Sequence, residues 1–95
     1  MKNTLFLDVF QLSCYSKIWR MTILLIERDK NNNEIGKSII AAHCATDDND
    51  KLEEFIRRVA VENNVKTIEY TEDKIYQYFS EELKNAYNFI KYKPF

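Results

Sequence analysis

The stretch TLFLDVFQL, residues 4–12, decides the fold of this chain because it is a strand with apolar side chains on both faces. Alternation within the strand expected over residues 3–12 gives one face with Leu5, Leu7 and Val9 and another with Phe6, Asp8, Phe10 and Leu12. Such a strand is typical of the interior of a sheet. A buried charge costs several kcal/mol unless it is paired or binds a metal. Asp8 is therefore either tolerated at a sheet edge or needed for function.

Composition indicates one globular domain over residues 1–95. Hydrophobic residues make up 45% of the chain and charged residues 31%, which is the range of folded proteins. The net charge of −1 provides no broad basic field, so nucleic acid is a possible partner but not a favoured one. Gly36 is the only glycine, which excludes the Gly-rich loops that bind phosphates, because those loops need several glycines.

Several features predict a cytoplasmic location. Cys14 and Cys44 match no metal-binding spacing and are expected to be reduced thiols. The beginning of the chain lacks the apolar core of a signal peptide, and the longest apolar run, MTILLI at residues 21–26, is too short to span a bilayer. We therefore expect no membrane partner. The abundance of Lys, Asn and Ile hints at an AT-rich genome, such as that of a phage or mobile element.

The rest of the chain continues the pattern of strands and helices in the order βββαβα. Further strands are expected over residues 17–28, 37–46 and 65–70, with a helix after the third strand and a mostly helical segment over residues 71–95. A right-handed crossover places the fourth strand beside the first and parallel to it. The predicted fold is α/β, with a four-stranded mixed sheet of strand order 3-2-1-4 and two helices.

The ends of the two helices can be predicted from capping residues. Asp50 and Glu53 have capping-box spacing at the start of the first helix, and Asn63 and Asn64 end it. Its apolar stripe consists of Leu52, Phe55, Ile56, Val59 and Ala60. The start of the second helix is open: residues 74–79 form either helix or a fifth strand, in which case Ser80 caps a shorter helix.

The order of elements, with an acid in the central first strand, resembles the ribonuclease H-like fold in a truncated form. In that family, carboxylates from the first strand, the first helix and the end of the fourth strand hold two magnesium ions. Truncated versions of the fold bind partners without catalysis. The alternative that the resemblance implies is a divalent-metal-dependent nuclease with catalytic acids Asp8, Glu53 and either Glu72 or Asp73, in which Asp8, Glu53 and Glu72 would hold Mg²⁺. The family usually has Gly and a small hydroxyl residue after the first acid, whereas this chain has Val9 and Phe10.

Each of these acids also has an interpretation without chemistry. Asp8 would bond to a Lys, Arg or Tyr near the rim of the sheet. Glu53 would cap the first helix, and Glu72 and Asp73 would favour a helix N-terminus.

The C-terminal third is rich in aromatic residues, since eight of the 13 lie at or after Tyr70. One helix face cannot bury all of them, and exposed Tyr beside Lys is typical of protein recognition. The predicted binding surface consists of Tyr76, Tyr87, Tyr92, Lys84, Lys91 and Lys93. The sequence thus predicts a small accessory or inhibitory protein without a cofactor, which binds an unidentified host or phage protein through an aromatic C-terminal helix. The nuclease is the alternative, and a homodimer through the same aromatics is left open.

Overall fold

The computed structural model describes residues 2–11, 18–71 and 73–92, which form a mixed α/β domain with one sheet. The described elements, in chain order, are β1 (Lys2–Gln11), β2 (Trp19–Arg28), β3 (Glu34–Thr46), α1 (Asn49–Glu62), β4 (Thr67–Tyr70), α2 (Asp73–Tyr78), α3 (Glu81–Ala86) and β5 (Asn88–Lys91). The α/β class is as predicted. The predicted number of elements, four strands and two helices, is wrong, because the described residues form five strands and three helices.

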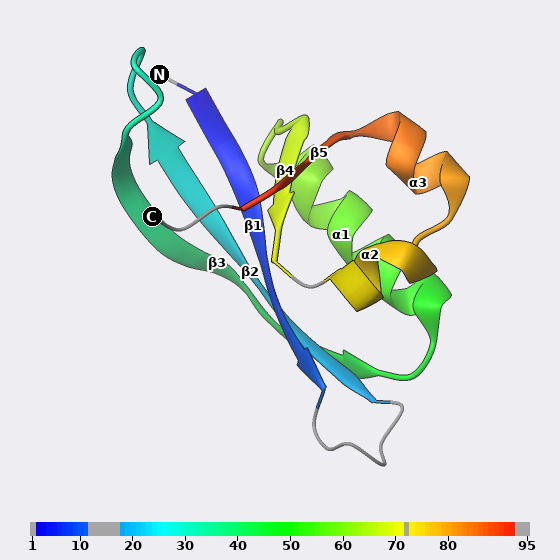
Figure 1. The fold of residues 1–95 in the computed structure, drawn as a ribbon. Helices are drawn as coiled ribbons and strands as arrows, with labels where there is room; N and C mark the ends of the chain where they lie inside the picture. Colours follow the sequence, from blue (N-terminus) through cyan, green and yellow to red (C-terminus); the bar gives the residue numbers. More distant parts are fainter. Residues whose placement is uncertain (1, 12–17, 72, 93–95) are drawn as a thin grey trace.

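The sheet has the strand order β3-β2-β1-β4-β5 (Figure 1). β1 is antiparallel to β2 and parallel to β4, and β4 is parallel to β5. The structure therefore places β1 inside the sheet, in agreement with its two apolar faces. The predicted order 3-2-1-4 lacks one strand of the observed sheet. That strand is β5, which lies beyond β4 and belongs to a segment predicted to be mostly helical.

The C-terminal segment is divided because Ser80 interrupts the helix. Ser80 has extended backbone angles, and its hydroxyl accepts the N–H of Leu83, so it caps α3 as an N-cap residue. The residues before it are helical in α2, which excludes the alternative of a strand there. α3 ends at Ala86, and the N–H of Asn88 bonds to the carbonyl oxygen of Lys66 at 2.9 Å, which starts β5 alongside β4.

The ends of α1 are set by polar residues on both sides. Asp48 is the N-cap residue, and its carboxylate accepts the N–H of Asp50 at 2.9 Å. The predicted capping box of Asp50 and Glu53 is therefore wrong, and Glu53 has a different role. Asn63 is the C-cap, and Asn64 has φ = 53°, so the predicted helix end is confirmed.

All three helices lie on one face of the sheet, which we call the covered face (Figure 1). The predicted stripe of α1 is buried there against alternate residues of the strands. The strand residues of this core are Leu5, Leu7, Val9, Met21, Ile23 and Ile68. The opposite face, which we call the open face, carries the alternating partners of these residues. Within the described ranges, every helix is too short or too polar to cross a membrane.

Candidate functional site

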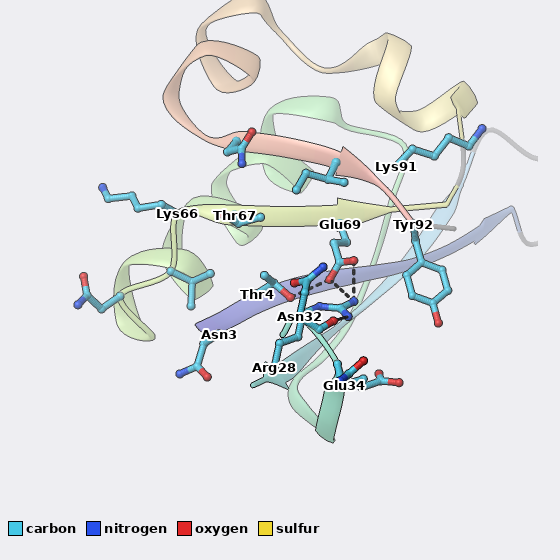
Figure 2. Close-up of a pocket in the computed structure, with 15 residues that line it drawn as sticks. Asn3, Thr4, Arg28, Asn32, Glu34, Lys66, Thr67, Glu69, Lys91 and Tyr92 are labelled. Carbon is cyan, nitrogen blue, oxygen red and sulfur yellow. Dashed lines mark hydrogen bonds and ion pairs between the residues drawn. The ribbon is translucent and has the colours of Figure 1, made fainter. Parts of the chain in front are cut away.

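The open face contains a buried acid, Glu69 of β4. Its neighbour Ile68 points into the core, so alternation directs Glu69 to the open face, where it is 7% exposed. Arg28 Nη2 donates to both carboxylate oxygens of Glu69, at 2.9 and 3.1 Å, and the Thr4 hydroxyl donates to one of them at 2.7 Å. These bonds join β1, β2 and β4 (Figure 2).

The position of Arg28 follows from the register of the strands. Arg28 is the last residue of β2 and lies opposite Lys2, so its long side chain crosses β1 to reach β4. Arg28 Nη1 also donates to the carbonyl oxygen of Asn32 in the turn between β2 and β3, at 3.2 Å. A partly buried ion pair adds little net stability, but loss of one partner leaves an uncompensated charge. The pair therefore connects β2 to β4 across β1.

A pocket of about 850 Å³ lies above this ion pair, at the end of the sheet where β1, β4 and β5 begin (Figure 2). Five asparagines are among its lining residues, namely Asn3, Asn32, Asn33, Asn64 and Asn88. Each amide can both donate and accept hydrogen bonds. Ile90 and Tyr92 supply apolar surface at the side of β5, and Ile90 is 45% exposed. The pocket thus combines neutral amides with charged residues of both signs, namely the paired Arg28 and Glu69 and also Glu34, Lys66 and Lys91.

The turn that forms one side of the pocket is held by Asp29. Its Oδ1 accepts the N–H groups of Asn31 and Asn33, both at 2.9 Å, and Asn32 adopts a left-handed φ of 68°. The backbone hydrogen bond from Asn33 is the main cause that lowers the pKa of Asp29 below its ordinary value. Asp29 therefore orders the turn that presents Asn32 and Asn33 to the pocket.

A second group of side chains lies on the open face beside the pocket. Tyr92 packs its ring edge-on against Phe6, with the ring centres 5.0 Å apart. The Lys37 ammonium lies 4.5 Å from the centre of the Phe6 ring and 5.9 Å from that of Tyr92. This cation–π contact covers Phe6, which is 8% exposed.

Two described acids of the nuclease hypothesis, Asp8 and Glu53, lie on opposite faces of the sheet. Asp8 is exposed on the open face, because its neighbours Leu7 and Val9 point into the core. Glu53 lies on the covered side, where its carboxylate accepts the N–H and the hydroxyl of Ser80, at 3.0 and 2.6 Å, and so joins α1 to α3. Asp73 forms an ion pair with Lys91. Within the part of the chain that the structure describes, no group of three or more His, Cys, Asp or Glu residues could hold a metal ion.

Four residues named from the sequence, Leu12, Cys14, Glu72 and Lys93, lie outside the described residues. The nuclease hypothesis stays a prediction, and no contact among the described residues favours it.

The residues of the predicted aromatic surface are divided between the two faces. Tyr76 stacks on Tyr70, with ring centres 4.5 Å apart, and is partly buried against the core together with Tyr87. Lys84 lies 4.8 Å from the centre of the Tyr76 ring and 3.7 Å from Glu81. Packing in this cluster has an electrostatic consequence, because burial raises the pKa of the Tyr70 phenol above its ordinary value.

Two residues of that surface, Lys91 and Tyr92, instead line the pocket on the other side of β5. The predicted aromatic C-terminal helix is therefore replaced by two short helices that complete the core and by a strand that borders the pocket.

Sequence reasoning missed the ion pair of Arg28 and Glu69. The available signal was an acid inside the short strand TIEY, the same signal that drew attention to Asp8. The partner of Glu69 lies 41 positions away in the sequence, so only the strand order brings the two together.

Comparison with known proteins adds no relationship, since no family model, no curated protein and no solved structure matches the chain.

Proposed function

We propose that this chain is a small accessory protein that binds another protein, and that the pocket beside β5 takes an extended segment of that partner. The main support for the proposal is the pocket of about 850 Å³, which has the exposed apolar side chain of Ile90 at its side. Interfaces concentrate binding energy where apolar or aromatic anchors stand next to polar groups that fix orientation. Ile90 and Tyr92 are the anchors here.

The polar lining supports a peptide as the occupant. The amide side chains of five asparagines can pair with peptide N–H and C=O groups, which are themselves both donors and acceptors. The floor offers no free charge, because Arg28 and Glu69 neutralise each other at 2.9 Å. Further charged lining residues are of both signs, Glu34, Lys66 and Lys91, so the pocket has no uniformly basic surface for a nucleic acid backbone, in line with the net charge of −1.

The proposal keeps the predicted mode of action and changes the surface. The sequence predicted contact with another protein through Tyr76, Tyr87 and Lys84. In the structure, Tyr76 and Tyr87 pack against the core, and Lys84 lies over the Tyr76 ring. Tyr92 and Lys91 remain part of the binding surface. An inhibitory role, a phage or mobile-element source and a ribonuclease H-like relationship stay predictions.

Affinity capture from a lysate of the source cells tests the proposal when it is done with matched variants. The baits are the wild-type chain, Ile90→Asp, Asn33→Ala and Val61→Asp. Val61 is 74% exposed on α1, so its variant carries the same charge change at a site away from the pocket. We expect a protein that the wild type and Val61→Asp retain, that Ile90→Asp loses, and that Asn33→Ala binds about tenfold more weakly.

Three outcomes contradict the proposal. The first is a partner that binds Ile90→Asp as well as the wild type, and the second is a partner that Val61→Asp loses equally. The third is capture of nucleic acid alone or of no protein. Thermal unfolding of each bait shows whether a lost partner reflects a lost surface or a lost fold.

A further inference from the structure

The part of the open face beside the pocket is complementary to itself. The strand register places Phe6 of β1, Leu24 of β2 and Ile39 of β3 in one row across three neighbouring strands. Ile39 is 69% exposed and Leu24 is partly exposed. On β3, Lys37 lies two residues from Ile39 and opposite Ile26 of β2. On β1, Asp8 lies two residues from Phe6 and opposite Thr22 of β2, so the two charges lie on opposite sides of the row. We call these five residues the β1–β3 patch.

The two charges of the patch do not pair with each other. Both residues are exposed, and among the ion pairs of the described residues none joins Lys37 to Asp8. The Lys37 ammonium instead lies over the Phe6 ring, which is a weak cation–π contact. Lys37 therefore has a flexible stem and a weakly held charge, which can turn to a carboxylate on another molecule.

We propose that the β1–β3 patch is the interface of a weak homodimer, in which Lys37 of each copy pairs with Asp8 of the other. A two-fold interface requires a surface that is complementary to itself. An apolar row with a cation on one side and an anion on the other meets this condition, because a two-fold axis in the plane of the interface exchanges the two charges. Leu24 and Ile39 then pack against the same apolar row of the second copy.

The size of the patch predicts the strength of the contact. Three strands about 4.8 Å apart make a patch about 10 Å wide, and the distance from Lys37 to Asp8 along the strands is about 13 Å. This is much less than the roughly 800 Å² per partner of a standard stable interface. The dimer is therefore expected only at high protein concentration, and salt weakens it because its specific contacts are exposed ion pairs.

The inference does not depend on the proposed function, although the two surfaces are neighbours: Tyr92 lines the pocket and also contacts Phe6 of the patch. The pocket uses Ile90 and the asparagines, whereas the dimer uses Lys37 and Asp8. Failure of one leaves the other intact, because self-association is measured on the pure protein and partner capture is measured with Ile90 and Asn33 variants.

Sedimentation velocity of the pure chain, from about 10 μM to about 1 mM, tests the dimer with reciprocal charge changes. Lys37→Glu gives a patch with two acids, and Asp8→Lys gives a patch with two lysines, so each variant alone should associate at least about tenfold more weakly than the wild type. An equimolar mixture of the two variants should restore association, since each acid then meets a lysine. The double variant Lys37→Glu/Asp8→Lys should also associate like the wild type.

Lys51→Glu is the matched control, because Lys51 is exposed on α1 and its change in net charge equals that of Lys37→Glu. It should associate like the wild type. The inference is overturned if the wild type stays monomeric up to the highest concentration, if the mixture of single variants stays monomeric, or if Lys51→Glu weakens association as much as Lys37→Glu. Circular dichroism spectra of all variants establish that each is folded.

Discussion

The two faces of the sheet are built from the same strands but are ordered by different forces. On the covered face, residues such as Leu5, Leu7 and Ile23 are fully buried beneath the helices. The open face also buries Phe6 and Ile26, but there a hydrogen bond and an ion pair hold Glu69, and Ile39 is 69% exposed. Apolar burial is non-directional and gives stability, whereas the polar contacts are directional and fix position. The covered face therefore stabilises the fold, and the open face leaves surface for binding.

The difference in stability between the two faces is tested most directly by truncating one apolar residue on each face. Leu7→Ala removes a fully buried side chain and should lower the free energy of unfolding by about 2–5 kcal/mol. Ile39→Ala removes an exposed side chain of similar size and should change it by less than about 0.5 kcal/mol. Urea unfolding followed by circular dichroism measures both. Equal losses would show that the open face is part of the stabilising core.

The ion pair of Arg28 and Glu69 provides a test of intermediate size. Arg28→Met or Glu69→Leu alone leaves one charge uncompensated in a site where both side chains are at most 14% exposed, and each should cost about 2–4 kcal/mol. The double variant should cost clearly less than the sum, because it removes both charges. A double-mutant cycle from urea unfolding gives the coupling energy. Additive losses would mean that the two charges do not stabilise each other.

The smallest expected effect concerns Asp29, at the pocket side of the open face. Its folded pKa is lowered by the N–H groups of Asn33 and Asn31, so its ionised form stabilises the folded chain at neutral pH. That contribution is lost as the pH falls from the ordinary aspartate range through the lowered pKa. The stability difference between the wild type and Asp29→Asn should therefore be present at neutral pH and vanish in acid. An NMR titration that gives Asp29 an ordinary pKa would contradict this.

Much of the covered face could be predicted from the sequence because it rests on local periodicity. The stripe of α1, from Leu52 to Ala60, is buried as expected, and alternation in β1 correctly assigns Leu5, Leu7 and Val9 to one face. The end of α1 at Asn63 and Asn64 was also predictable, because a left-handed residue needs only local tolerance.

The C-terminal third was harder to predict because two patterns compete there. Apolar spacing from Ile75 to Leu83 fits one long helix, yet Ser80 has a better role as an N-cap residue. Once the chain turns at Ser80, α3 is short and the segment after Tyr87 reaches the free edge of β4. The backbone bonds of β5 to β4 are long-range, so periodicity gives no signal for them.

The site shows the same division between local and long-range information. The sequence drew attention to Asp8 as an acid in an interior strand, and the structure leaves Asp8 exposed. The buried acid of the open face is Glu69, which bonds to Arg28 and Thr4 from two other strands.

The sequence by itself determined the faces of each strand and helix, because side-chain direction follows from a repeat of two or 3.6 residues. Only the tertiary structure decided which face is covered by helices and which acid is buried with a partner. The physical reason is that burial and ion pairing depend on strand order and register, which join residues as far apart as Thr4 and Glu69.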